Sequence, residues 1–286
     1  MDDVVKKDLL IGVFSNYTWD KIKYWVNSAI SSGFTGDKLL VIYSTDNSTL
    51  EKIRNKGFKV LGFNQNATTG DLFYDRQLVI VVQRFIDLWH FLSTNDLSMY
   101  RYIIHTDVKD VVFQTNPSTW LTDNMGEYKI LASCESISYQ DEPWGDENLK
   151  SSFPMMYEKL KSQPIWNCGV QAGEPIFMRD LWFSIYNLCK GTMVLNSDQA
   201  AYNVLLNLEP YKSVTKFTMS ESSWAAQLGT TMDPTKMVAF LPKLLEQQPI
   251  MIDDLVCTTN GTPHCIVHQY DRVLMWRNII EQKYSN

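Results

Sequence analysis

The segment RYIIHTDVKDVVFQTNP, residues 101–117, places His105, Asp107, Lys109 and Asp110 within six residues, between two apolar runs. The first run is typical of a buried strand, so the two carboxylates should lie where a strand leaves its sheet. Ligands of open α/β sheets bind beyond the carboxyl ends of the strands, and carboxylate oxygens there suit Mg²⁺ or Mn²⁺, which in turn bind a diphosphate. Aspartate is also common in turns after strands, so spacing alone leaves both a metal site and a simple turn open.

Four further segments contain residues that could act on a ligand. Arg84 lies in VVQRF, Asn167 and Gly169 lie in WNCGVQAGEPIF, Asp198 lies in NSDQAAYNVLL and His268 lies in HCIVHQYDRV. Each has a structural alternative: a surface salt bridge for the arginine, a glycine-bearing turn, a helix cap for the aspartate and a buried structural histidine. No segment taken alone distinguishes the ligand-binding role from the structural one.

Taken together and in chain order, these segments resemble GT-A-type glycosyltransferases over roughly residues 8–275. In that family a DxD-like motif at the end of a central strand holds a divalent cation, which binds the diphosphate of a nucleotide-sugar. HTDVKDVVFQTNP is similar to the family pattern D-V-[RK]-D-V-V-F-Q followed by proline, although its carboxylates are spaced D-x-x-D. The resemblance implies that Asp107, Asp110 and His268 bind Mn²⁺ or Mg²⁺. It leaves open whether Asp107 ligates directly or through water or ribose.

The resemblance also implies a nucleotide-sugar donor, with a UDP-sugar favoured. We expect the base and ribose in the loop VFSNYTWD, where Tyr17 would stack on the uracil or donate a hydrogen bond to it; ordinary packing against the next helix is its alternative. The residues expected to bind the donor are Ser15, Asn16, Tyr17, Arg84, His105, Asn167 and Gly169.

Transfer to an acceptor needs a base within about 3 Å of the acceptor hydroxyl if the reaction inverts the anomeric centre. The candidates are Asp198, Glu135 in SCESIS, and Asp141 and Glu142 in YQDEPWGDE. An acidic residue near the sugar can instead orient hydroxyls in a retaining enzyme, and the sequence leaves both stereochemical outcomes open.

The chain also resembles the small soluble glycosyltransferases of chlorella viruses, some of which transfer xylose from UDP-xylose to fucose. This similarity implies an oligosaccharide or glycoprotein acceptor, such as a viral capsid N-glycan, and a location in the host cytoplasm. An apolar run too short for a signal peptide follows the acidic N-terminal residues, which also favours a cytoplasmic protein.

Strand and helix patterns alternate up to residue 107. Strands are expected over 8–15, 38–46, after Gly57 and over 100–107, with helices over 17–33, 48–57 and 74–94, the second of them opened by Ser48 or Thr49. This alternation predicts an α/β fold, a single GT-A-like (Rossmann-like) domain over 1–286 with a mostly parallel central sheet flanked by helices. Residues 8–115 would form the nucleotide-binding half and 116–286 the acceptor-binding half. Residues 141–154 are polar and predict a mobile loop.

The composition excludes several classes of protein. A hydrophobic content of 45% with 20% charged residues argues against disorder. The net charge of −6 without a basic cluster argues against nucleic-acid binding. The five cysteines show no C-x-x-C pair and no disulfide framework. No stretch reaches the roughly 18 uncharged apolar residues of a membrane span, so no membrane insertion is expected.

Two other functions fit parts of the pattern. A sugar nucleotidyltransferase also uses a metal on an α/β sheet, but it usually has a glycine-rich phosphate loop near its first strand, and GVFSNYTWDK has no such cluster. A non-catalytic carbohydrate-binding protein would use the abundant aromatic residues and would need neither nucleotide nor metal.

Overall fold

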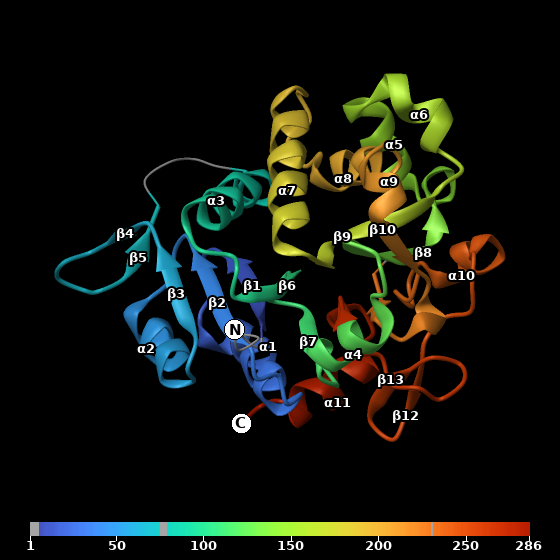
Figure 1. Ribbon diagram of the computed structural model, residues 1–286. Coiled ribbons are helices and arrows are strands. Elements are labelled where there is room, and N and C mark those ends of the chain that lie inside the picture. Colours follow the sequence, from blue (N-terminus) through green and yellow to red (C-terminus); the bar gives the residue numbers. More distant parts are fainter. Residues whose placement is uncertain (1–5, 75–78, 230) are drawn as a thin grey trace.

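The computed structural model describes residues 6–74, 79–229 and 231–286 of the chain (Figure 1). The predicted alternation of strands and helices in the first part is confirmed. In chain order the elements are β1 (Lys7–Phe14), α1 (Trp19–Ser31), β2 (Asp37–Ile42), α2 (Asn47–Asn55), β3 (Lys59–Gly62), the hairpin β4 (Asn64–Gln65) and β5 (Leu72–Phe73), α3 (Ile80–Thr94) and β6 (Tyr100–Thr106). Residues 75–78 of the predicted third helix lie outside the described residues.

The central sheet has seven strands in the order β10-β8-β9-β6-β1-β2-β3. The second half of the chain adds β8 (Ile130–Ser138), β9 (Pro164–Gly173) and β10 (Thr215–Thr218). All neighbouring pairs are parallel except the two that include β9, which is antiparallel to both β6 and β8. The prediction of an α/β fold with a mostly parallel central sheet is therefore confirmed.

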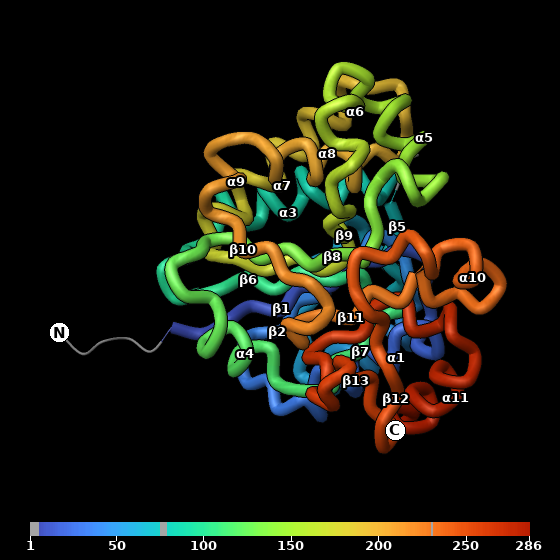
Figure 2. The backbone as a smooth tube through the Cα atoms, turned by 90° about the vertical axis from the view of Figure 1, so that its right-hand side faces the viewer, coloured from blue at the N-terminus to red at the C-terminus, as the bar shows by residue number. Residues whose placement is uncertain are grey.

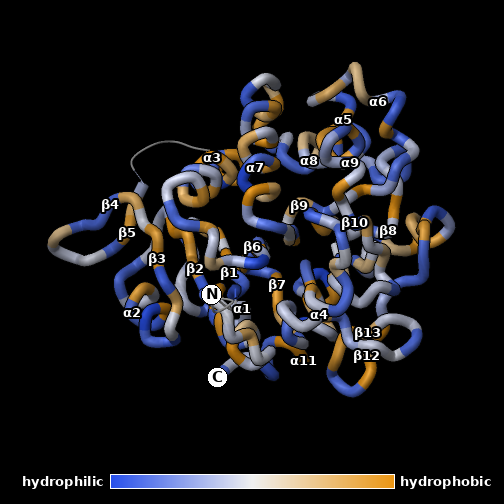
Figure 3. Tube along the Cα trace, in the orientation of Figure 1, coloured by the Kyte–Doolittle hydropathy of each residue, from blue (hydrophilic) through white to orange (hydrophobic). Residues whose placement is uncertain are grey.

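Helices cover both faces of this sheet, as Figure 2 shows with α3, α7 and α8 on one side and α1 on the other. One face packs Trp25 of α1 and Leu50 of α2 into the core, and the other packs Phe85 of α3 and Trp182 of α7. Hydrophobic residues are concentrated along the central strands (Figure 3), which explains why those strands read as apolar runs. The flanking helices of the second half are α4 (Pro117–Asn124), α5 (Pro143–Ser152), α6 (Pro154–Leu160), α7 (Pro175–Lys190), α8 (Asp198–Leu206), α9 (Tyr211–Val214), α10 (Met237–Phe240) and α11 (Leu274–Lys283).

A second, three-stranded sheet lies beside the carboxyl end of β6. Its order is β11-β14-β7, with β14 (Ile266–His268) parallel to β11 (Ala225–Gln227) and antiparallel to β7 (Val111–Phe113). This small sheet joins the segment directly after Asp110 to a segment near the end of the chain. The hairpin of β12 (Ile250–Ile252) and β13 (Leu255–Cys257) completes the described strands.

Two local predictions are wrong. Residues 141–154 form the helix α5 and the start of α6 instead of a mobile loop, because the Glu142 carboxylate accepts hydrogen bonds from the first backbone N–H groups of α5 and Pro143 suits its first position. Helix α2 is capped by Asp46, whose side chain accepts from the Thr49 N–H, and not by Ser48 or Thr49. The glycine-bearing turn considered as an alternative for Asn167 and Gly169 is also not present, because both residues lie in the buried strand β9.

None of the described helices combines the length and the apolar character needed to cross a membrane. All five cysteines are free and buried.

Candidate functional site

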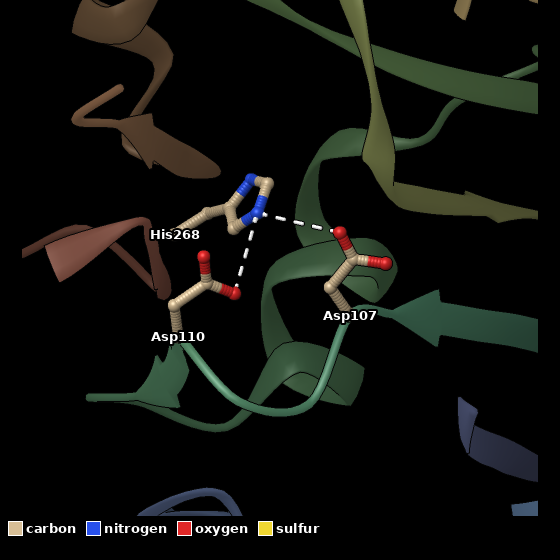
Figure 4. A group of neighbouring side chains, drawn as sticks. All are labelled: Asp107, Asp110 and His268. Carbon is tan, nitrogen blue, oxygen red and sulfur yellow. Dashed lines mark ion pairs between the residues drawn. The ribbon is translucent and has the colours of Figure 1, made fainter. Parts of the chain in front are cut away.

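Asp107, Asp110 and His268 converge at the junction of the two sheets (Figure 4). Each offers a ligand atom, and these atoms all lie within 4.8 Å of one another. His268 Nε2 lies 3.7 Å from Asp107 Oδ2 and 3.8 Å from Asp110 Oδ1. The spacing D-x-x-D therefore brings both carboxylates to the same imidazole nitrogen.

The backbone fixes where these three residues lie. Asp107 follows the last residue of β6, and its N–H donates to the Gly169 carbonyl at 2.8 Å. Asp110 immediately precedes β7, and its carbonyl accepts from the Gln269 N–H at 2.7 Å. Because β14 pairs with β7 in a register that places His268 opposite Val111, the imidazole is held beside the carboxylates.

Gly169 lies against this group, and a side chain there would collide with it. A Cβ atom at this position would lie 2.6 Å from His268 Cε1 and 2.7 Å from Asp107 Oδ2. Glycine is thus the residue that lets β9 approach the group closely. The structure places Gly169 next to the predicted metal ligands.

Arg84 connects Asp107 to Asp198. The Arg84 Nη1 group donates to Asp107 Oδ1 at 2.5 Å, and Nη2 donates to Asp198 Oδ2 at 3.1 Å. The arginine is buried at 6% exposure, so it is not the surface salt bridge considered as its alternative. Burial opposes ionisation of Asp107, but the Arg84 guanidinium and the His268 imidazole together outweigh this effect and hold the pKa of Asp107 well below its usual range. Burial raises the pKa of Asp198, and Arg84 offsets only part of that rise.

A cavity of about 370 Å³ opens beside Asp107 and Asp110. Ser15 and Tyr17 line it from the loop after β1, and a neighbouring cavity of about 510 Å³ includes Tyr17 and Asn16. Burial raises the pKa of Tyr17, and the charges of Asp110 and Asp107 raise it further. The predicted loop residues are therefore brought together with the predicted metal ligands.

The cavity also contains three cationic side chains, Arg84, Lys109 and Arg272. Only Arg84 was among the predicted site residues. Lys109 lies between the two aspartates, and Arg272 follows the HQYD segment. Both residues could have been predicted from the sequence, because each is a basic residue inside a segment that carries predicted metal ligands. Cations in a cleft that holds carboxylates suit a ligand with anionic oxygens next to a bound metal.

Glu135 and Asn167 form a pair adjoining the group. Asn167 Nδ2 donates to Glu135 Oε1 at 2.8 Å, and Asn167 Oδ1 accepts from the Gly169 N–H at 2.7 Å. Burial raises the pKa of Glu135 to about 7. A carboxyl group with such a pKa can take up a proton near neutral pH.

The other two candidate bases are occupied by structural contacts. Glu142 caps α5, with Oε2 accepting from the Gly145 N–H at 2.6 Å. Asp141 accepts from the Ser138 hydroxyl at 2.6 Å and lies 3.9 Å from Lys243 Nζ.

His105 lies in the core on β6, with its ring 5.5 Å from that of Trp182 and 6.3 Å from that of Phe85. It is fully buried, and neither ring nitrogen has a hydrogen-bond partner among the described residues. Burial lowers its pKa to about 3, so the ring is neutral. His105 is not among the residues that line the cavity beside Asp107.

The donor set of the group fits a divalent cation. Two carboxylates and an imidazole are ligands that Mn²⁺ and Mg²⁺ sites use. Burial lowers the pKa of His268, but the Asp107 and Asp110 carboxylates outweigh it and raise that pKa above its ordinary value. The two carboxylates therefore favour a positive charge between the ligand atoms of Asp107, Asp110 and His268.

No family model matches the sequence, and no curated protein matches it. Solved structures do match. The WbbM bifunctional glycosyltransferase shares 12% identity and a TM-score of 0.61, over 100% of this chain and 50% of that one. Mouse xyloside xylosyltransferase 1 shares 13% identity and a TM-score of 0.50, over 91% of this chain and 97% of that one. This chain thus spans half the length of the first protein and nearly all of the second, and it has the fold of these two glycosyltransferases.

Proposed function

We propose that the protein is a metal-dependent glycosyltransferase that moves a sugar from a nucleotide-sugar to a hydroxyl group of a glycan acceptor. One observation carries the proposal: Asp107, Asp110 and His268 converge at the edge of a cavity that also contains basic side chains. The fold shared with two glycosyltransferases supports the same conclusion.

Different side chains would bind the metal ion and the phosphate groups of the donor. Asp107, Asp110 and His268 would hold Mn²⁺ or Mg²⁺, and the bound cation would act as a Lewis acid that neutralises charge on the leaving diphosphate. Lys109 and Arg272 would donate charge-assisted hydrogen bonds to phosphate oxygens.

The donor's nucleoside would occupy the cavities beside the loop after β1, with Ser15, Asn16 and Tyr17 as contacts. Asn167 and Gly169 would border the transferred sugar. His105 would act only indirectly, as a neutral core residue of β6.

Glu135 is the carboxylate best suited to deprotonate the acceptor hydroxyl. Its pKa of about 7 lets it act as a base near neutral pH, and it is partly exposed. Asp198 is held by Arg84 and would orient a sugar hydroxyl, whereas Asp141 and Glu142 are engaged elsewhere.

A UDP-sugar is the favoured donor, and UDP-xylose is the first to test. The resemblance to the chlorella virus enzymes suggests it, and one structural neighbour is described as a xylosyltransferase. The same resemblance suggests fucose of a viral capsid N-glycan as acceptor, a cytoplasmic location, and one domain with a nucleotide-binding and an acceptor-binding half.

The test is a screen of UDP- and GDP-sugars with Mn²⁺ and fucosylated acceptors. Release of free nucleoside diphosphate with a glycosylated product is expected, and chelation should stop it. Asp110→Asn should remove turnover, while the exposed control Asp96→Asn should keep it. Release of pyrophosphate would indicate nucleotidyl transfer instead. Thermal stabilisation by glycan but not by Mn²⁺ with UDP would indicate a binding protein.

A further inference from the structure

Gln227 lies directly behind the candidate metal ligand His268. It is the last residue of β11 and pairs in register with His268 on β14, so both side chains lie on the same face of the small sheet. Gln227 Oε1 is 2.7 Å from His268 Nδ1, and Gln227 Nε2 donates to Ser133 Oγ at 2.8 Å. All three residues are buried, at 4%, 2% and 1% exposure.

This chain of contacts determines which nitrogen of His268 carries a proton. A glutamine side chain has one oxygen that only accepts and one nitrogen that only donates. Since the nitrogen of Gln227 is directed to Ser133, its oxygen faces Nδ1, and only a protonated Nδ1 can donate to it. A neutral imidazole has a single N–H, so Nε2 is left with its lone pair.

That lone pair faces the two carboxylates, at 3.7 and 3.8 Å. A lone pair between carboxylate oxygens is unfavourable unless a cation lies among them. With the opposite tautomer, Nε2–H would donate to Asp107 or Asp110 and could not ligate a metal. Hydrogen bonds to the second nitrogen of a ligating histidine fix its tautomer and raise its basicity.

We propose that Gln227, itself oriented by Ser133 of β8, is a positioning residue that fixes His268 in the tautomer able to ligate the cation. The metal-binding role rests on the proposed function, but the tautomer does not. Gln227 therefore links the central sheet to the candidate metal group through side chains alone.

The tautomer can be measured without metal, nucleotide or activity. We would record ¹⁵N spectra of the imidazoles in metal-free protein at a pH where His268 is neutral; the chain has only four histidines, and His268→Gln assigns the signal. Protonation on Nδ1 is expected, with a shift toward the other tautomer in Gln227→Leu. A proton on Nε2 in the native protein, or a tautomer that Gln227→Leu leaves unchanged, would overturn the proposal.

Metal affinity gives a second readout, measured by Mn²⁺ calorimetry. Gln227→Leu should bind Mn²⁺ about 10- to 100-fold more weakly. Gln227→Glu should bind at least as tightly as the native protein, because a carboxylate also accepts from Nδ1–H. The matched control is Gln171→Leu, since Gln171 is a fully buried glutamine that contacts Trp182 and Cys168. It should lose stability but keep Mn²⁺ affinity.

If Gln227→Leu, Gln227→Glu and Gln171→Leu all weaken Mn²⁺ binding equally, Gln227 contributes only core packing, and the proposal is overturned. Failure of the native protein to bind Mn²⁺ would instead overturn the proposed function, and the ¹⁵N spectra would still decide the tautomer. The two failures are therefore distinguishable.

Discussion

The two aspartates of the candidate metal group lie beside different sheets, and they differ in the charged partners that the protein provides for them. On the side of the seven-stranded sheet, Asp107 follows β6 and is paired with the buried Arg84. On the side of the three-stranded sheet, Asp110 immediately precedes β7 and His268 is the last residue of β14. Within the described residues the only ion pair of Asp110 is with His268. Arg84, together with His268, holds the pKa of Asp107 low despite burial, whereas burial raises the pKa of Asp110.

This difference indicates separate roles for the two aspartates. Asp107 is stabilised by the protein's own cation, so it supports the fold as well as the site. Asp110 is a partly buried carboxylate, its side chain 15% exposed, without a comparable partner, and its charge is unfavourable in the folded protein until a cation binds. A divalent ion would therefore chiefly neutralise the carboxylate of Asp110, on the side of the small sheet.

The largest expected effect is on turnover in Asp110→Asn. A catalytic cation contributes several kcal/mol of transition-state stabilisation, so losing this ligand should reduce turnover by at least about 1,000-fold. Because the folded-state pKa of Asp110 is raised, its charged form destabilises the metal-free protein above that pKa, and the substitution should increase metal-free stability at pH 7. That gain should vanish at acidic pH, where the native carboxyl is neutral.

Asp107→Asn is the matched comparison. It should also impair turnover, but it should lower the free energy of unfolding by about 1–3 kcal/mol, because Arg84 loses a charged partner. The pKa of Asp107 is lowered, so its stabilisation is present above the unfolded-state pKa and is lost as pH falls toward the folded-state value. Chemical denaturation of both variants over a pH series is the measurement. Equal stability changes would contradict the assignment of separate roles.

The next effect concerns Glu135, on the side of the large sheet. Glu135→Gln should reduce the rate by about 100-fold, the lower end of general-base catalysis. In the native enzyme, kcat/KM should rise with pH through an apparent pKa near 7, since the base must be deprotonated. Initial rates from pH 5 to 9 test this. A rising limb that persists in Glu135→Gln would assign the base elsewhere.

Gly169→Ala tests how tightly the two sides are packed together. The new methyl group would meet both His268 and Asp107, so the free energy of unfolding should fall by about 1–3 kcal/mol and Mn²⁺ affinity should fall with it. Gly191→Ala is the control, because a Cβ atom there would come no closer than 3.3 Å to the Leu188 carbonyl oxygen and the φ of Gly191 is −82°. Unchanged metal affinity in Gly169→Ala would show that the group tolerates displacement.

Arg272→Ala removes a cation from the side of the small sheet and should weaken UDP binding by about tenfold, or 1.4 kcal/mol. Affinity for Mn²⁺ alone should not fall, because Arg272 is a counter-charge for phosphate and not a ligand. Arg277→Ala, which removes an arginine paired with Glu281 on α11, is the control. Titration of UDP by calorimetry separates the two variants, and equal losses would remove Arg272 from the donor site.

The smallest effect is expected for Glu142→Ala, outside both sides. Loss of the cap of α5 should lower the free energy of unfolding by about 1 kcal/mol. Thermal denaturation measures this change. A much larger loss of turnover than of stability would return Glu142 to the candidate bases.

The two sides also differ in how far the sequence predicts them. The large-sheet side follows from local patterns, since strands and helices alternate up to Asp107. The small sheet does not, because its three strands have three residues each and come from distant segments, so no periodicity reveals their pairing. His268 was selected only through a resemblance.

Other misses have local causes. The direction of β9 depends on pairing with β6 and β8, and a buried strand reads the same in either direction. Helix α5 was taken for a loop because of its polar composition, although Glu142 followed by Pro143 is a helix-start signal. The predicted donor-binding role of His105 stays a prediction; its ring is fully buried on β6.

The pairing of β14 with β7 has a consequence for how the protein matures. Until the ribosome has translated past residue 268, the imidazole of the candidate metal group does not exist, and β7 has no neighbour in its own sheet among the described strands. A nascent or prematurely terminated chain would thus carry the two aspartates without His268. If the proposed metal site is right, tight binding of Mn²⁺ would begin only after synthesis has passed this strand.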